Sequence, residues 1–110
     1  MKIAVPTATG VLCPHFGHCE KFALVEVVDG TVAAVTWLSP PQHEPGVLPR
    51  FLKENGATMI ISGGMGWRAQ QFFRDMGIEV VTGAPPLDPG EVVKQYLAGT
   101  LVTGDNLCDH

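Results

Sequence analysis

Hydrophobic positions along the chain fall into short blocks separated by turn-forming residues. Apolar, β-branched blocks predict strands, which we place at Lys2–Val5, Phe22–Val28, Thr31–Leu38, Thr58–Ser62 and Ile78–Thr82. We expect the first strand to end at Pro6 and a loop to follow over Thr7–His18. Asp29-Gly30 tolerates positive φ as a two-residue turn, so the strands on either side of it should form an antiparallel hairpin.

Three other blocks have the periodicity of amphipathic helices. We place them at about Val47–Asn55, Trp67–Met76 and Asp88–Gly99. Gly56 and Gly77 follow the first two helices as stop signals. Asp88 is a good N-cap for the third helix, and Glu91 three residues later predicts a capping box.

The order of these elements predicts a mixed five-stranded sheet covered by helices. The strand–helix units in the second half imply parallel strands, and the hairpin adds antiparallel pairing. Ligands of such sheets bind beyond the C-terminal ends of the parallel strands. Because Thr7–His18 and Gly63–Gly66 each follow a strand, we expect the two loops to face each other at that edge. Thr31–Leu38 could lie at a sheet edge and pair with a second copy, so we expect a monomer or a homodimer.

Composition bounds the class of protein. A chain of 110 residues with 45% hydrophobic and 16% charged residues is one globular domain, 1–110, with an irregular tail over 100–110. The net charge of −4 and the scattered basic residues argue against nucleic acid as a partner. No apolar run approaches the roughly 18 residues that span a membrane, and no signal peptide is evident. We therefore expect a cytoplasmic protein with reduced thiols.

The segment Cys13-Pro14-His15-Phe16-Gly17-His18-Cys19 concentrates the candidate chemistry. Thiolates and imidazoles suit zinc, copper(I), iron and iron–sulfur assemblies, but the spacing matches no standard zinc-finger pattern. We predict metal ligands at Cys13, His15, His18 and Cys19, and further candidates at His43, Cys108 and His110. The competing interpretation is that an isolated loop histidine is merely solvated and a cysteine is a small buried hydrophobe.

Gly63-Gly64-Met65-Gly66 follows a strand and opens a helix. Backbone N–H groups at such a positive helix end favour anions, and Arg68 in the first turn could neutralise an anionic ligand. We therefore count Gly63, Gly64, Met65, Gly66 and Arg68 as candidate cofactor-binding residues. A tight strand-to-helix turn with a solvated arginine explains the same pattern.

Catalytic constellations are sparse. Ser39 and Ser62 lack the context of a nucleophile elbow, and the acidic residues form no obvious pair for two-metal hydrolysis. We therefore do not expect an enzyme. A small thiol-dependent enzyme using Cys13 or Cys19 beside a histidine is the less favoured alternative.

The sequence resembles the dinitrogenase iron–molybdenum cofactor family, which contains nitrogenase cofactor-biosynthesis accessory proteins. Matching stretches cover residues 1–7, 15–27, 50–84 and 91–101, including His15-Phe16-Gly17 and the Gly63-Gly64-Met65-Gly66 turn. The resemblance implies a three-layer α/β/α ribonuclease-H-like fold and a role in binding iron–sulfur or molybdenum-containing clusters. His18 and Cys19 stand where many members have arginine after His-Phe-Gly, and the ending Asn-Leu-Cys-Asp-His is similar to a cysteine-containing branch.

Three functional hypotheses follow. The first is a non-catalytic carrier or scaffold for an iron–sulfur or molybdenum–iron–sulfur cluster that works with cofactor-assembly proteins. Cys108 and His110 could then fold over the site as a lid. The second is a regulatory or structural module for a simple ion such as zinc. The third is the thiol-dependent enzyme, which requires a cysteine of low pKa.

Overall fold

The sheet at the centre of the molecule is mixed, as the sequence predicts. The structure, a computed structural model, describes residues 1–41 and 47–104. The strands are β1 (Lys2–Ala8), β2 (Val11–Leu12), β3 (Lys21–Val28), β4 (Thr31–Leu38), β5 (Ala57–Ile61) and β6 (Glu79–Val81). The main path runs in the order β4-β3-β1-β5-β6, and the short β2, which the sequence did not predict, pairs with β1. The β1–β5 and β5–β6 pairs are parallel, whereas the others are antiparallel.

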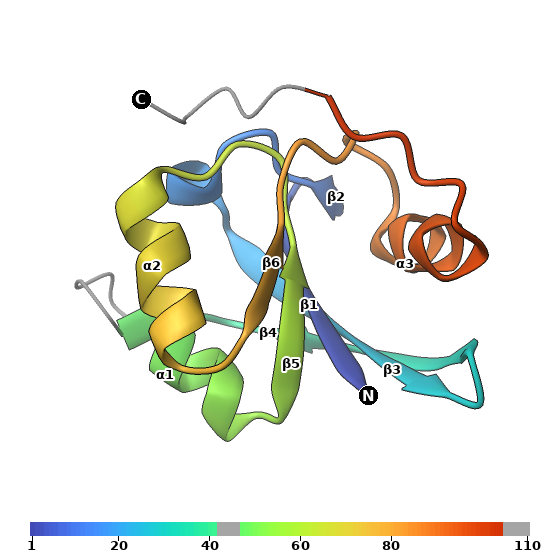
Figure 1. The fold of residues 1–110 in the computed structure, drawn as a ribbon, viewed down its shortest axis with the longest axis horizontal. Coiled ribbons are helices and arrows are strands. Elements are labelled where there is room, and N and C mark those ends of the chain that lie inside the picture. Colours follow the sequence, from blue (N-terminus) through green and yellow to red (C-terminus); the bar gives the residue numbers. More distant parts are fainter. Residues whose placement is uncertain (42–46, 105–110) are drawn as a thin grey trace.

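Helices cover both faces of the sheet. They are the 3-10 helix η1 (Phe16–His18) and the α-helices α1 (Val47–Glu54), α2 (Trp67–Asp75) and α3 (Pro89–Ala98). Helices α1 and α2 lie on one side of the sheet and α3 on the other (Figure 1). Alternation along β1 divides the buried side chains, because Ala4 joins the cluster beneath α1 and α2 while Ile3 and Val5 join the cluster beneath α3. This is the predicted three-layer α/β/α fold, and we call its two sides the α1–α2 face and the α3 face.

Strand β1 runs through Pro6, where the sequence predicted its end. Pro6 lies opposite Phe22 of β3, while its carbonyl accepts a hydrogen bond of 2.9 Å from the Cys13 N–H on the other side of the strand. Parallel pairing of β1 with β5 has already ended at Ala4, so the N–H that proline lacks falls where no β5 partner needs it. The predicted loop over Thr7–His18 therefore contains the end of β1, β2 and η1.

Local signals in the sequence are confirmed at the hairpin and at α3. Asp29 and Gly30 both have positive φ, 53° and 73°, as a tight two-residue turn requires. The Asp88 side chain accepts hydrogen bonds from the N–H groups of Gly90 and Glu91 at 3.0 and 3.4 Å, so it is the N-cap of α3. The predicted capping box is not completed, because the Glu91 carboxylate accepts from Gln95 Nε2 at 3.2 Å rather than from the Asp88 N–H.

The hairpin strand β4 forms one edge of the sheet, as predicted, and β6 forms the other. Five consecutive residues of β4, 33–37, are exposed.

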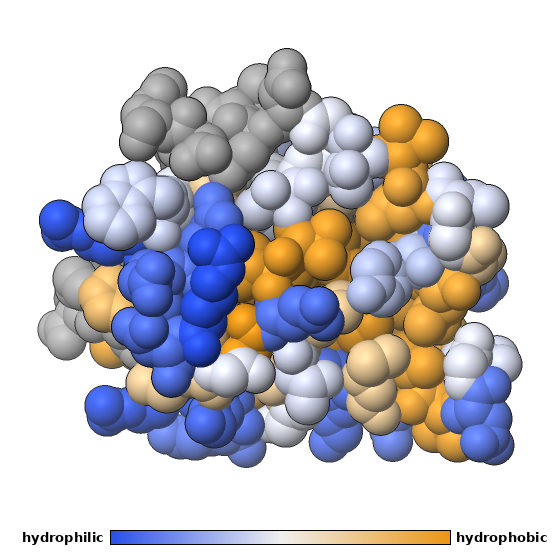
Figure 2. Space-filling model, in the orientation of Figure 1, coloured by the Kyte–Doolittle hydropathy of each residue, from blue (hydrophilic) through white to orange (hydrophobic). Residues whose placement is uncertain are grey.

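In Figure 2 hydrophilic residues gather over the outer side of α2, and hydrophobic residues gather towards β6 in the middle of the view. Within the described residues, every helix is too short or too polar to cross a bilayer.

Candidate metal site

The two loops that the sequence places at one sheet edge are in direct contact. His15 and Gly64 form an isolated parallel β-bridge. The Phe16 N–H donates to the Gly64 carbonyl at 2.8 Å, and the Gly64 N–H donates to the Pro14 carbonyl at 2.5 Å. The predicted juxtaposition is therefore confirmed. The Gly64 N–H is already used in joining the loops, so it is not directed at a ligand.

Gly63 lets the two backbones approach this closely. A Cβ atom at this position would lie 2.7 Å from the Pro14 carbonyl oxygen and 2.9 Å from the Cys13 carbonyl oxygen. Backbone atoms cannot yield as a flexible side chain could. Contact between loops thus explains why this position needs glycine.

Both described cysteines lie inside the protein, beneath this contact. Cys13 is 3% exposed and Cys19 is 8% exposed, and both belong to the apolar cluster of the α1–α2 face. The Cys13 thiol donates to the His15 carbonyl oxygen at 3.0 Å. The residues between them are more exposed at Pro14, His15 and Gly17, so the two sulfurs are buried under a thin, accessible segment.

Burial also changes the acidity of Cys19. Desolvation, with a smaller contribution from the charge of Cys13, raises the pKa of the Cys19 thiol from 9.0 to about 11. Both cysteines belong to the same apolar cluster, so neither thiol has the solvation that favours a thiolate. Cys19 is therefore a protonated thiol at neutral pH, and a metal that binds it must displace the proton.

Phe16 anchors the segment between the two cysteines. Its ring meets Phe73 of α2 edge to face at a centroid distance of 5.7 Å, and lies 6.2 Å from the Phe22 ring of β3. Aromatic pairs in this geometry add to the stabilisation from burial alone. The aromatic residue of the His-Phe-Gly motif thus holds the loop against the sheet, a role that the sequence does not predict.

The other predicted ligands are less closely gathered. The His15 side chain is exposed, the side chain of His18 lies outside the described part of the structure, and so do His43, Cys108 and His110. Among the described side chains, no three of the types His, Cys, Asp and Glu come together as a metal site. Gly104, the last described residue, donates to the Gly83 carbonyl at 2.7 Å, and Gly83 donates to Gly63 at 2.8 Å. The tail thus leaves the described structure close to the loop contact.

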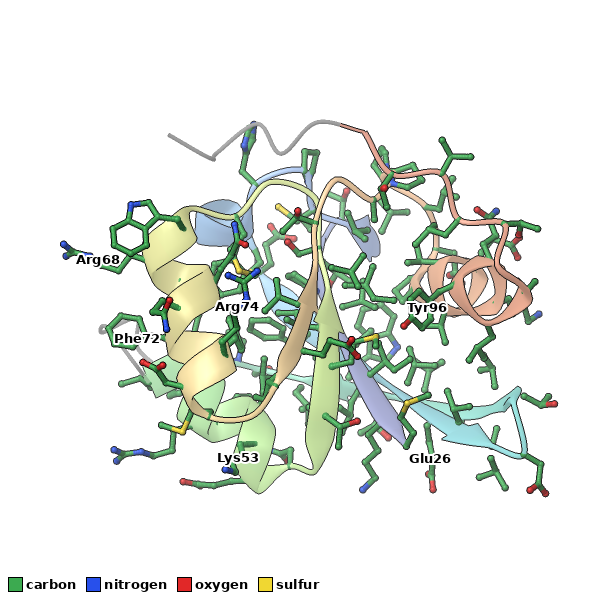
Figure 3. All side chains as sticks on the ribbon, in the orientation of Figure 1. Glu26, Lys53, Arg68, Phe72, Arg74 and Tyr96 are labelled. Carbon is green, nitrogen blue, oxygen red and sulfur yellow. The ribbon has the colours of Figure 1, made fainter. Side chains whose placement is uncertain are left out.

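The candidate anion-binding residues have varied surroundings. Met65 is fully buried, and its carbonyl accepts from Gln70 Nε2 at 2.8 Å. Gly66 is the N-cap residue of α2. Arg68 is exposed and extends away from the sheet at the outer side of α2 (Figure 3). Binding of an anion by these residues remains a prediction.

Ser62 is a buried polar residue that the sequence pattern does not single out as a site residue. It is fully buried, and its hydroxyl oxygen has no hydrogen-bond partner among the described atoms. Such an unsatisfied group costs about 1–3 kcal/mol. Its position at the end of an apolar strand, directly before Gly63-Gly64, is the signal that marks it.

Comparisons with known proteins agree with this architecture. Residues 1–99 match the family described as dinitrogenase iron–molybdenum cofactor. An uncharacterised protein of Methanocaldococcus jannaschii is 34% identical over 106 residues, which cover 92% of this chain and 89% of the relative.

Two solved structures are similar over nearly their whole length. The crystal structure of the protein PH0822 has a TM-score of 0.85 and 32% identity, with 94% of each chain covered. The apo form of the orange protein from Desulfovibrio gigas has a TM-score of 0.73 and 24% identity, covering 96% of this chain and 93% of that one. The second likeness concerns the fold alone. The match over residues 1–99 shows that the chain belongs to the dinitrogenase iron–molybdenum cofactor family.

Proposed function

We propose that this protein is a non-catalytic carrier or scaffold that binds an iron–sulfur or molybdenum–iron–sulfur cluster through Cys13 and Cys19. The observation that carries the proposal is the burial of two thiols in one apolar cluster, joined by a short segment that is exposed at Pro14, His15 and Gly17. Thiolates are the protein ligands of iron–sulfur clusters. Membership of a family named for the iron–molybdenum cofactor supports the same ligand class.

The chemistry of the donors fits such a cargo in part. Two thiols lie in the described site, and His15 and His18 belong to the same segment. His43, Cys108 and His110, which lie outside the described residues, are proposed as additional ligands. Contacts of Gly63–Gly66 and Arg68 with the anionic cluster stay a prediction, because the Gly64 N–H is bonded to Pro14 and Arg68 extends away from the sheet.

Binding requires proton release and a local movement. Cys19 must lose a proton that burial holds tightly, so uptake should liberate protons and weaken at low pH. Phe16 and the hydrogen bonds to Gly64 hold the segment in place, so admission of a cluster requires these contacts to open locally. We place this exchange in the cytoplasm, where thiols stay reduced.

The raised pKa of Cys19 opposes a catalytic role for this thiol. A catalytic cysteine needs a thiolate at neutral pH, and therefore a lowered pKa. Burial acts in the opposite direction on Cys19. A zinc-binding module would use the same thiol and imidazole donors. The reconstitution experiment distinguishes it from a cluster-binding protein.

Anaerobic reconstitution tests the proposal. Purified protein is incubated with iron, sulfide and molybdate, desalted, and analysed for metal content and visible absorption. We expect stoichiometric uptake with sulfur-to-metal absorption bands, and loss of both in the Cys13→Ser/Cys19→Ser variant. Uptake that is unchanged in this variant contradicts the proposal. A colourless protein that binds zinc tightly and melts at lower temperature with chelator identifies the zinc module instead.

A further inference from the structure

The buried hydroxyl of Ser62 lies in the same layer of the fold as the two thiols. Ile60 belongs to the apolar cluster of the α1–α2 face and Ile61 to that of the α3 face. Ser62 continues this alternation, because its N–H donates to the Val81 carbonyl at 2.8 Å and its carbonyl accepts from Ala84 at 3.1 Å, extending the ladder beside β6. Its side chain is therefore directed to the α1–α2 face, where Cys13 and Cys19 are buried.

Ser62 is also joined to the cysteine loop through its neighbour. The next residue, Gly63, has the close backbone contact in which a Cβ atom would lie 2.9 Å from the Cys13 carbonyl oxygen. The hydroxyl thus originates one residue from the place where the strand end and the cysteine loop meet. The Ser62 hydroxyl, which has no partner among the described atoms, is thus directed to the same side of the sheet as the two thiols.

A second buried hydroxyl shows what a purely structural role looks like in this fold. Thr7 is 1% exposed, and its Oγ1 donates to the Lys21 carbonyl at 2.8 Å. Ser62 is as deeply buried but has no such partner among the described atoms. Native proteins pair almost all buried polar side chains, so the Ser62 hydroxyl has room in its hydrogen-bonding capacity for a bound group, which the Thr7 hydroxyl lacks.

We infer that the Ser62 hydroxyl donates a hydrogen bond to an anionic sulfur of the bound metal–sulfur group. This inference rests on the proposed function, since it needs the group that Cys13 and Cys19 hold. Metal-bound sulfur is negatively charged and accepts hydrogen bonds, and donors around a metal site commonly govern retention of the metal. Ser62 is accordingly a positioning residue that reaches the ligand without binding the metal.

The test compares Ser62→Ala with Thr7→Val in anaerobically reconstituted protein. Affinity is measured by competition with an iron chelator, and the melting temperature of the metal-free protein is measured in parallel. We expect Ser62→Ala to lose metal about 10-fold more readily, while its metal-free melting temperature is unchanged or higher. Thr7→Val should show the reverse: a lower metal-free melting temperature and unchanged chelator competition.

The outcomes separate this inference from the proposed function. Metal uptake that depends on Cys13 and Cys19 but is equally tight in Ser62→Ala overturns the inference alone. The inference is also overturned if metal-free Ser62→Ala melts as low as metal-free Thr7→Val. Such a fall would mean that the Ser62 hydroxyl has a structural partner within the chain. No uptake by the unmodified protein, or uptake that survives Cys13→Ser/Cys19→Ser, overturns the proposed function and the inference with it.

Discussion

The two faces of the sheet are both closed by apolar packing, yet they carry different chemistry. The α1–α2 face buries both described cysteines together with Phe73, whereas the α3 face is filled by side chains such as Ile3 and Val92. Burial alone therefore does not distinguish the site from the scaffold. The difference lies in the segment between β2 and β3, which crosses the α1–α2 face and brings its sulfur atoms into that core.

How each face is closed explains this difference. The helix on the α3 face begins at the Asp88 cap and packs Val92 and Val93 inward, as an ordinary amphipathic helix does. On the α1–α2 face, part of the cover is the cysteine segment itself, held by Phe16 and by hydrogen bonds to Gly64. Substitutions on the α3 face should thus lower stability alone, while those under the cysteine segment should also change metal binding.

The largest contrast should come from truncating one large core residue on each face. Phe73 and Ile3 are both fully buried. Phe73→Ala should lower the free energy of unfolding by about 3–5 kcal/mol, and Ile3→Ala by about 2–5 kcal/mol. Phe73→Ala should also weaken metal retention, because Phe16 loses its edge-to-face partner. Urea denaturation and metal content per folded chain measure the two effects, and equal retention in both variants would remove the proposed distinction between the faces.

The second contrast concerns pH and the buried thiol. Because the pKa of Cys19 is raised from 9.0 to about 11, the unfolded chain loses this proton first as pH rises. This group should therefore reduce stability between pH 9.0 and about 11, by about 1–2 kcal/mol once solvent screening is allowed for, and have no such effect below pH 9.0. Denaturation curves of the unmodified protein and of Cys19→Ala should converge or cross over this range. Parallel curves would mean that Cys19 is not desolvated.

A third, smaller effect tests the contact between the loops. Gly63→Ala places a methyl group against the Pro14 and Cys13 carbonyl oxygens, so it should cost about 1–3 kcal/mol and weaken metal retention. Gly17→Ala is the matched control, since a Cβ atom there meets nothing within 4 Å. Chemical denaturation should show a near-neutral change for Gly17→Ala. If both variants lost the same stability, the cost at Gly63 would not come from its close contact with the Pro14 and Cys13 carbonyl oxygens.

The smallest effect should come from the cap of α3. Asp88→Ala removes two hydrogen bonds to the first turn of the helix and should cost about 1 kcal/mol. Because Asp88 belongs to the scaffold on the α3 face, chelator competition should be unchanged. A shift in metal retention would show that the α3 face communicates with the cysteine segment.

The sequence was most informative where local rules decide the structure. The turn at Asp29-Gly30, the cap at Asp88 and the edge position of β4 follow from residue type and order. The meeting of the two loops also followed from topology, because strands β1 and β5 end at the same edge.

Features that depend on tertiary contact could not be predicted in this way. Pro6 continues β1 because of where neighbouring strands end, which a single strand does not reveal. Cys13 and Cys19 belong to a loop that lacks core periodicity, yet Phe16 draws that loop into the core. The missing partner of Ser62 is likewise visible only once its surroundings are known.

The most direct test is metal analysis of the protein purified anaerobically from cells, beside the Cys13→Ser/Cys19→Ser variant. If the buried thiols hold a metal–sulfur cluster, the unmodified protein should contain iron and acid-labile sulfide in a fixed ratio, with or without molybdenum, and the variant should contain neither. An unmodified protein without metal, or a variant with the same metal content, would contradict this function for Cys13 and Cys19.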